Sequence, residues 1–366
     1  MTSIMIVGLG RVGSRTLKYL RELIPKASFI VVDTDKNKLV EVSKYEGIEA
    51  YQYEPGILGK LGEKVDLAVT ALPSSIAWRS ILELTSRCVS VVDVSFVNED
   101  PYILEKVIGE CNSFLVVDAG FAPGYSNIVA GYAFYKLGLK YNIEIAVGGI
   151  PEYPVPPIGY VVTWSARDLL EEYTRPARII EDGVVKSVDP LAFIKNIEIP
   201  GIGVLEAFLS DGLRTMLRNI KARNLREYTL RWPGHISAIR LLRDLGFLNS
   251  DEVEINGVTI KPIDFTATLF EKKLSLKIND IAVLQVSASG DTLQYRETAL
   301  LKGSIEDPAT PVFTALVHAY TVKLGVEKKI KPGVIAPENL YEYKEEYEKY
   351  LASKGVVINK ESTIQQ

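Results

Sequence analysis

The sequence has few residues of the types that build metal centres and disulfide scaffolds. It contains two cysteines, Cys88 and Cys111, and two histidines, His235 and His318. Two cysteines exclude a disulfide-rich scaffold and a cysteine zinc site, and two histidines argue against a histidine metal centre. From the cysteine count we infer a reducing, intracellular setting. We therefore expect a cytoplasmic protein without a bound metal.

Long apolar runs and strong net charge are missing as well. No run approaches the length of a membrane span, and no signal peptide precedes the first predicted strand, so we expect no membrane association. The net charge of −4 gives no reason to expect a nucleic-acid partner. The 366 residues, 47% of them hydrophobic and 24% charged, are enough for two globular domains.

The first third of the chain alternates short apolar runs with helical patterns. The runs lack polar alternation, which is typical of strands covered on both faces; they occupy residues 3–8, 28–33, 66–73, 89–96 and 113–120. Strands that alternate with helices in this way indicate an α/β fold with a doubly wound parallel sheet. We assign residues 1–120 to a Rossmann domain.

After about residue 125 the pattern changes. Residues 142–165 are rich in proline and β-formers, residues 272–289 alternate like a half-exposed strand, and Asn256-Gly257 between two short β-like runs predicts a hairpin. This composition predicts an α+β domain with an antiparallel or mixed sheet, inserted over residues 121–330. Residues 331–366 form a separate last segment with a charged amphipathic helix.

A glycine-rich turn follows the first predicted strand and opens a helix. The pattern GLGRVG spans Gly8–Gly13 and is typical of dinucleotide binding in this context. The first glycine allows the tight turn, the second lets a pyrophosphate approach the backbone, and the third lets helix and strand pack. The predicted phosphate contacts are Gly8, Gly10, Arg11, Val12 and Gly13.

The acid at the end of the second strand indicates which cofactor binds. Asp33 would accept hydrogen bonds from the adenosine ribose and repel a 2′-phosphate, so NAD is favoured over NADP. Thr34 follows it where an arginine would favour NADP, although Lys36 leaves some NADP use open. Asp35 is the alternative ribose ligand.

Two further strand ends are expected to border the nicotinamide, because ligands cross the carboxyl ends of the strands in such sheets. The residues concerned are Ala71, Leu72, Pro73, Val94 and Ser95. Ordinary strand-to-helix loops are the alternative interpretation of both stretches.

A second glycine loop, VVDAGFAPGYSNI, spans Val116–Ile128 and places Asp118 at the end of another strand. By the same geometry its carboxylate should face the nicotinamide side of the sheet. We expect Asp118 to be catalytic, because an amine loses hydride only when its nitrogen is neutral and a base can take the proton. The alternative is that Asp118 caps the helix that follows the loop.

Four motifs give the chain a family resemblance. They are DAGFAPGYSNI, TWSARDLLEEYTRPARII, AFLSDGLRTML and TLRWPGH, in this order. With them the chain resembles the saccharopine dehydrogenase-like family, and within it the lysine 6-dehydrogenases. The match covers residues 1 to about 250 and is interrupted at ETALLKGS, where Leu300 stands in place of a family arginine, before GVIAPENL restores it.

The resemblance implies an NAD-dependent oxidoreductase that acts on a C–N bond of a small amino acid. Lysine 6-dehydrogenases convert the ε-amine of lysine to 2-aminoadipate 6-semialdehyde and ammonia. Saccharopine and carboxynorspermidine dehydrogenases act on secondary amines, which is the alternative activity. A third possible function is that of a non-catalytic module that senses the cofactor. The resemblance also implies a homodimer and a last segment that returns to the Rossmann domain.

The motifs of the second domain supply candidates for substrate contacts. Tyr173 is a candidate catalytic residue and Arg175 a candidate substrate contact. Both lie in the stretch that helps relatives hold a substrate carboxylate, and a surface ion pair is the alternative for Arg175. Ser210 and Asp211 are predicted to contact the α-amino end of the substrate, or else to cap the next helix.

The LRWPGH motif adds two more candidates. Arg231 is a predicted substrate contact, and His235 is a candidate proton relay near neutral pH. A packed structural histidine is the alternative for His235, and His318 is expected to lie in a helix without a chemical role.

Overall fold

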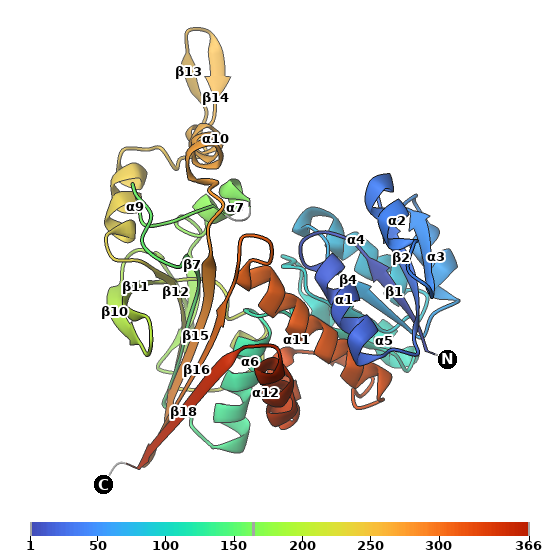
Figure 1. The fold of residues 1–366 in the computed structure, drawn as a ribbon. Coiled ribbons are helices and arrows are strands. Elements are labelled where there is room, and N and C mark those ends of the chain that lie inside the picture. Colours follow the sequence, from blue (N-terminus) through green and yellow to red (C-terminus); the bar gives the residue numbers. More distant parts are fainter. Residues whose placement is uncertain (1, 163–164, 365–366) are drawn as a thin grey trace. The chain divides into compact units, whose positions relative to one another are not determined.

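The structure is a computed structural model that describes residues 2–162 and 165–364 (Figure 1). Within this range the chain forms two compact units. The first unit comprises Met1–Gly131 and Pro311–Lys354, and the second comprises Tyr132–Thr310 and Gly355–Gln366. Thr163 and Trp164, which open the second family motif, lie outside the described residues.

The first unit is built on a seven-stranded parallel sheet with the order β17-β6-β5-β4-β1-β2-β3. The order of its first six strands is that of a doubly wound dinucleotide-binding sheet, as predicted. Their apolar runs are buried because helices cover the sheet. The strands are β1 Ser3–Val7, β2 Ser28–Asp33, β3 Ile48–Gln52, β4 Leu67–Thr70, β5 Val91–Asp93, β6 Phe114–Val116 and β17 Gly333–Ile335.

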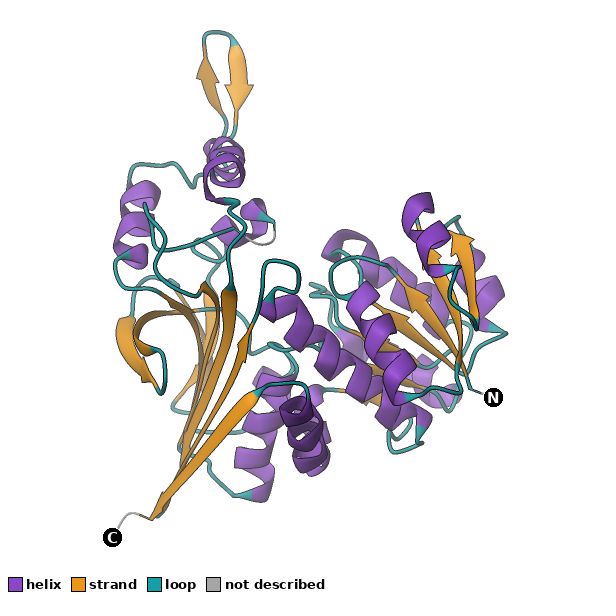
Figure 2. Ribbon diagram, in the orientation of Figure 1, coloured by secondary structure: helices purple, strands orange, loops and turns teal. Residues whose placement is uncertain are grey.

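Several helices of the first unit flank these strands (Figure 2). An apolar core that includes Met5, Val32 and Ile81 lies between strands and helices. The helical elements are α1 Gly13–Leu23, α2 Lys36–Val42, α3 Ile57–Gly62, α4 Ser74–Thr85, η1 Pro101–Leu104, α5 Glu105–Glu110, α6 Tyr125–Gly131, α11 Ala309–Val326, η3 Pro337–Tyr343 and α12 Lys344–Ser353.

The second unit is built on a nine-stranded mixed sheet, in agreement with the predicted α+β character. Seven strands follow the order β10-β11-β12-β7-β15-β16-β18, and β8 pairs with both β12 and β9. The strands are β7 Asn142–Pro151, β8 Ala177–Glu181, β9 Val184–Val188, β10 Ile194–Ile199, β11 Gly203–Leu209, β12 Asn224–Arg231, β15 Asp280–Ser289, β16 Leu293–Lys302 and β18 Val357–Ile364.

A separate hairpin and several helices complete the second unit. The predicted hairpin is confirmed, because Asn256 and Gly257 both have positive φ and turn β13 into β14. The elements are η2 Tyr132–Lys136, α7 Ala166–Glu171, α8 Met216–Asn219, α9 His235–Asp244, β13 Val253–Ile255, β14 Val258–Ile260 and α10 Pro262–Leu274.

The limits of the two units differ from the predicted boundaries at 120/121 and 330/331. Most of α11 belongs to the first unit, where His318 reaches the Val92 carbonyl oxygen at 3.1 Å and Thr16 Oγ1 at 3.3 Å. β17 pairs with β6, so part of the last segment does return to the Rossmann sheet. β18, however, lies in the second unit, where it pairs with β16.

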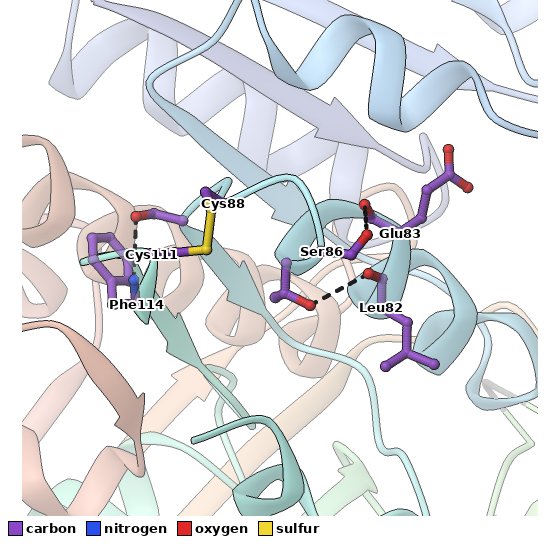
Figure 3. Close-up of a disulfide and its surroundings, with 8 residues drawn as sticks. Leu82, Glu83, Ser86, Cys88, Cys111 and Phe114 are labelled. Carbon is purple, nitrogen blue, oxygen red and sulfur yellow. Dashed lines mark hydrogen bonds between the residues drawn. A yellow bond between two sulfur atoms is a disulfide. The ribbon is translucent and has the colours of Figure 1, made fainter. Parts of the chain in front are cut away.

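The inference of a reducing setting loses its basis, because Cys88 and Cys111 form a disulfide (Figure 3). Cys88 follows α4 and Cys111 follows α5, so the bond joins the segments that lead into β5 and β6. Nearby, the Phe114 N–H donates to Ser90 Oγ at 3.3 Å, a second link between the same segments. The cysteine count therefore carries no argument about the compartment.

Replacing both cysteines by serine is expected to lower the free energy of unfolding by about 3 kcal/mol. The disulfide joins residues that are 23 positions apart, and this link restricts the unfolded chain. Urea unfolding monitored by circular dichroism measures the loss. A reductant should lower the stability of the parent chain by the same amount and leave the double serine variant unchanged. Equal stability of the parent chain with and without reductant would contradict the prediction.

Candidate dinucleotide and active site

The glycine turn after β1 has the geometry of a phosphate cradle. Gly8 has φ +96°, and a Cβ there would lie 2.5 Å from the Ala71 carbonyl oxygen. A Cβ on Gly13 would lie 1.9 Å from the Gly8 carbonyl oxygen, so the helix start packs directly on the turn. Gly10 is exposed, and a Cβ there would meet nothing within 4 Å. The open side at Gly10 is where a phosphate can approach the backbone.

The cradle continues into the first turn of α1. Exposed Arg11 and half-buried Val12 lead into the helix, and Val12 is its N-cap residue. No side chain caps this helix start. The first N–H groups of a helix have no intrahelical acceptor, and together with the helix dipole they favour an anion such as a pyrophosphate.

Asp33 lies at the end of β2 against this turn. Its Oδ2 accepts the Leu9 N–H at 2.5 Å, and its Oδ1 accepts the Asp35 N–H at 2.8 Å. The Asp35 carboxylate, the alternative ribose ligand, instead caps α2 by accepting the N–H groups of Asn37 and Lys38. The turn and the Asp33 carboxylate therefore fit a dinucleotide whose ribose hydroxyls approach Asp33.

The loops after β4 and β5 border the same edge of the sheet. The Ala71 N–H donates to the Val7 carbonyl oxygen at 3.0 Å, and the Ala71 carbonyl oxygen lies against Gly8 of the turn. The Leu72 N–H donates to Ser95 Oγ at 3.2 Å, which links the two loops. Pro73 is exposed, Val94 is half-buried and Ser95 is buried.

Asp93 is a buried acid at the same edge of the sheet, and none of the sequence motifs predicted a role for it. It ends β5, is fully buried, and accepts Thr70 Oγ1–H at 2.5 Å, Ser95 Oγ–H at 2.9 Å and the Ser95 N–H at 3.0 Å. Burial raises the pKa of Asp93 to about 7; the hydrogen bonds from Thr70 and Ser95 oppose this shift, and the charge of Asp118 adds to it. The sequence does contain a feature that could have predicted this residue. VVDVS at residues 91–95 resembles VVDAG at residues 116–120, the pattern from which Asp118 was predicted.

Asp118 lies beyond the end of β6 in the second glycine loop. It is 1% exposed and has the left-handed backbone conformation, with φ +52°. Because its charge acts on Asp93, the two carboxyl groups belong to one electrostatic environment at the carboxyl edge of the sheet. α6 begins only at Tyr125, so Asp118 does not stand at the N-terminus of that helix.

The loop after Asp118 turns sharply because of its glycines. Gly124 has φ +133°, and a Cβ there would lie 1.9 Å from the Gly120 carbonyl oxygen. The Gly120 N–H in turn donates to the Pro123 carbonyl oxygen at 3.2 Å. The loop thus closes on itself, and glycine is required where the two backbones approach this closely.

In the second unit, three motif residues form one buried hydrogen-bonded chain. The Arg231 Nε–H donates to Tyr173 Oη at 3.3 Å, and Tyr173 Oη lies 2.7 Å from His235 Nε2. His235 Nδ1 faces the Ile158 carbonyl oxygen at 2.8 Å, which assigns the proton to Nδ1 and makes Nε2 the acceptor from Tyr173. All three side chains are at most 3% exposed.

This environment opposes a proton relay by His235. Burial, and next the Arg231 charge, lower the pKa of His235 to about 3, although the Ile158 carbonyl favours the protonated ring. Burial likewise raises the pKa of Tyr173 above its ordinary value. Both side chains are therefore neutral near pH 7, and the packed structural histidine describes His235 better than the relay.

Arg231 is also engaged by protein groups. Its Nη2 donates to Glu172 Oε2 at 3.0 Å and its Nη1 to the Leu230 carbonyl oxygen at 3.0 Å. Its guanidinium carbon lies 4.5 Å from the ring centroid of Tyr160. Burial raises the pKa of Glu172, and the charges of Arg231 and then of half-buried Arg175 oppose this shift.

Ser210 and Asp211 do not cap the following helix, since Thr215 is the N-cap residue of α8. Asp211 instead binds Arg178 through two side-chain bonds of 2.8 and 2.9 Å. Ser210 Oγ donates to Glu227 Oε1 at 3.3 Å. Substrate contacts by these two residues remain a prediction.

Two family models match the chain. The saccharopine dehydrogenase C-terminal domain matches residues 120–356, and the TrkA-N domain matches residues 4–84. Among solved structures, the apo saccharopine dehydrogenase (L-Glu forming) of Saccharomyces cerevisiae has a TM-score of 0.83 at 18% identity, and the match covers 99% of this chain and 100% of that chain. This likeness shows a shared fold.

Curated relatives are similar over different shares of the chain. The carboxyaminopropylagmatine dehydrogenase of Synechocystis is 26% identical over 45% of this chain, and the mitochondrial alpha-aminoadipic semialdehyde synthase of Rattus norvegicus is 24% identical over 88%. The chain spans 42% of the length of the first and 37% of the second. The saccharopine dehydrogenase [NADP(+), L-glutamate-forming] of Schizosaccharomyces pombe is 24% identical over 69% of this chain and 60% of its own length.

Gly10→Ala is expected to weaken NAD binding tenfold or more without a change in thermal stability, because the added methyl group meets no protein atom within 4 Å but occupies the space of the phosphates. Fluorescence titration with NAD and thermal unfolding measure the two effects. Gly13→Ala is the matched control: its methyl group collides with the Gly8 carbonyl oxygen, so stability should fall as well. Unchanged affinity in Gly10→Ala would contradict the cradle.

Tyr173→Phe is expected to lower the free energy of unfolding by about 1–3 kcal/mol, because it leaves His235 Nε2 buried without its donor. Tyr228→Phe is the control, since the Tyr228 hydroxyl makes only a 3.4 Å contact with half-buried Glu144. We expect this variant to lose less unfolding free energy than Tyr173→Phe. Urea unfolding of both variants tests the difference. An equal loss in the two would show that the Tyr173 hydroxyl has no special role.

Proposed function

The chain belongs to the saccharopine dehydrogenase family, and from this premise we propose that it is an NAD-dependent dehydrogenase that oxidises the ε-amine of L-lysine. The observation that carries the proposal is the phosphate cradle Gly8–Gly13 with the Asp33 carboxylate against it. The products would be 2-aminoadipate 6-semialdehyde and ammonia.

The choice of NAD rests on charge. The Asp33 carboxylate accepts the Leu9 N–H of the turn, so a 2′-phosphate on the adjacent ribose would bring negative charge towards it. Lys36 and Lys38 begin α2, but Asp35 holds that helix start through its own carboxylate. These contacts support NAD over NADP for this chain, although the Schizosaccharomyces pombe relative is named for NADP(+).

Bound NAD would supply the hydride acceptor. The residues of the chain would have to make the amine neutral, because free lysine has a side-chain pKa of about 10.4 and is an ammonium ion at pH 7. Asp118 is the proposed base, since a buried carboxylate pairs with the ammonium and takes its proton more readily than one in water. Its position at the carboxyl edge of the parallel sheet, where such folds bind ligands, supports this role.

A secondary amine is the second candidate substrate, and the relatives favour it. Their names describe a carboxyaminopropylagmatine dehydrogenase and saccharopine dehydrogenases. The stretch that departs from the family motif, ETALLKGS, lies mainly on β16, where Leu300 packs against an apolar cluster. The family arginine is thus replaced by a half-buried apolar side chain, which supports a substrate with fewer carboxylates than saccharopine.

Purified protein mixed with lysine and NAD is expected to increase absorbance at 340 nm and to release ammonia, at a rate that rises toward alkaline pH because the substrate amine must lose its proton. Saccharopine tested in the same assay separates the primary from the secondary amine. NAD reduction by saccharopine and not by lysine would reject the lysine activity and retain the family chemistry.

The Asp118→Asn variant serves as the control for the catalytic role. It keeps the size of the side chain and removes the base, so NAD binding should persist while turnover falls by a factor of about 100 or more. A chain that binds NAD but reduces it with no amine, before or after the substitution, would instead be a cofactor-sensing module.

A further inference from the structure

Asp93 is a buried acid that the proposed chemistry does not use. Its carboxyl group ends β5 and makes hydrogen bonds only to Thr70 and Ser95 among the described residues. No Lys or Arg forms an ion pair with it in the described part of the chain. A carboxyl group without a cation, and without solvent, is costly to ionise. Such a group is a poor choice for stability alone.

The hydrogen bonds of Asp93 reach the two loops expected to border the nicotinamide. Thr70 is the last residue of β4, and Ser95 lies in the loop after β5. The Ser95 hydroxyl donates to Asp93 Oδ1 and accepts the Leu72 N–H, so a continuous chain runs from Asp93 through Ser95 to Leu72. The charge on Asp93 therefore affects the backbone of both loops.

The groups that face Asp93 set its ionisation. Burial raises its pKa to about 7, the donors Thr70 and Ser95 lower it, and the negative charge of Asp118 raises it. From α11, His318 reaches the neighbouring Val92 carbonyl, but burial lowers the pKa of His318 to about 4, so the ring is neutral. At neutral pH the Asp93 carboxyl group is thus divided between its acid and its carboxylate form.

We propose that Asp93 is a positioning residue of the cofactor site, which fixes the ends of β4 and β5 and releases a proton to solvent when the positively charged oxidised nicotinamide binds. The inference rests on the proposed function, because it needs a nicotinamide cofactor at this edge of the sheet. It goes beyond that function by giving the oxidised and the reduced cofactor different affinities. The residue acts through Thr70 and Ser95, since it is fully buried.

The direction follows from charge. The nicotinamide ring carries one positive charge in NAD and none in NADH. A cation near Asp93 stabilises the carboxylate, so binding of NAD moves the group toward ionisation and releases a proton, whereas NADH leaves it unchanged. By the same linkage, the affinity for NAD rises with pH through the region near 7 and the affinity for NADH does not.

Calorimetric titration of the full chain with NAD at pH 7, in phosphate and in Tris, tests the proposal. The two buffers differ in ionisation enthalpy, so a released proton makes the binding enthalpy differ between them. Release of up to about half a proton per NAD is expected, because a group with a pKa near the working pH is about half protonated. Titration with NADH should give no buffer dependence.

Asp93→Asn should bind NAD without proton release, and Asp280→Asn is the matched control. Asp280 is also a buried carboxyl group whose pKa is raised by burial, but it lies in the second unit, so its removal should leave the release unchanged. Thr70→Val offers a second variant if Asp93→Asn does not fold. It removes a donor that stabilises the carboxylate, so the release should move to higher pH.

Buffer-independent binding of NAD by the parent chain, or proton release that persists in Asp93→Asn, would overturn the inference while leaving the proposed dehydrogenase intact. Release that does not move in Thr70→Val would overturn it as well. A chain that binds neither NAD nor NADH would overturn the proposed function, and this inference with it.

Discussion

The close approach of backbone to backbone at Gly8 and Gly13 is the constraint on which the first unit depends. The Gly13 backbone leaves no room for a Cβ against the Gly8 carbonyl oxygen, and Gly8 leaves none against Ala71. These contacts hold the start of α1 against the ends of β1 and β4. A Cβ on Gly10 would meet no protein atom within 4 Å, and Asp33 binds the same turn through the Leu9 N–H. A side chain at either packed glycine would separate the helix from the sheet.

The parallel sheet also determines where the acidic side chains of the first unit lie. Because β4, β5 and β6 run in one direction, their carboxyl ends bring Thr70, Asp93 and Asp118 to one edge. The two acids there have different surroundings: Asp93 is surrounded by hydroxyl and N–H donors, and Asp118 lies in a loop that turns away from the sheet. Like charges in one buried environment disfavour double ionisation. The negative charge of Asp118 therefore adds to the effect of burial, which raises the pKa of Asp93.

The periodicity of apolar residues was sufficient to predict the Rossmann sheet, the mixed second sheet and the hairpin at Asn256-Gly257. Both glycine loops could be interpreted residue by residue, because a glycine turn is a local feature. The disulfide could not be predicted, since Cys88 and Cys111 are separated by 23 residues and meet only through the parallel sheet. The limits of the units were missed for a related reason: α11 joins the first unit through contacts of His318 with distant residues.

Motif residues of the second unit illustrate a different limit of sequence reasoning. Arg231 and His235 have side chains that suit catalysis, yet the structure surrounds both with protein partners. A substrate carboxylate that bound Arg231 would compete with Glu172, which already accepts the Arg231 Nη2–H at 3.0 Å. Tyr173 and Glu172 are thus protein partners for the buried Arg231 guanidinium. If this unit binds substrate, the contact belongs to side chains that are less enclosed, such as half-buried Arg175 in the TWSARDLLEEYTRPARII motif.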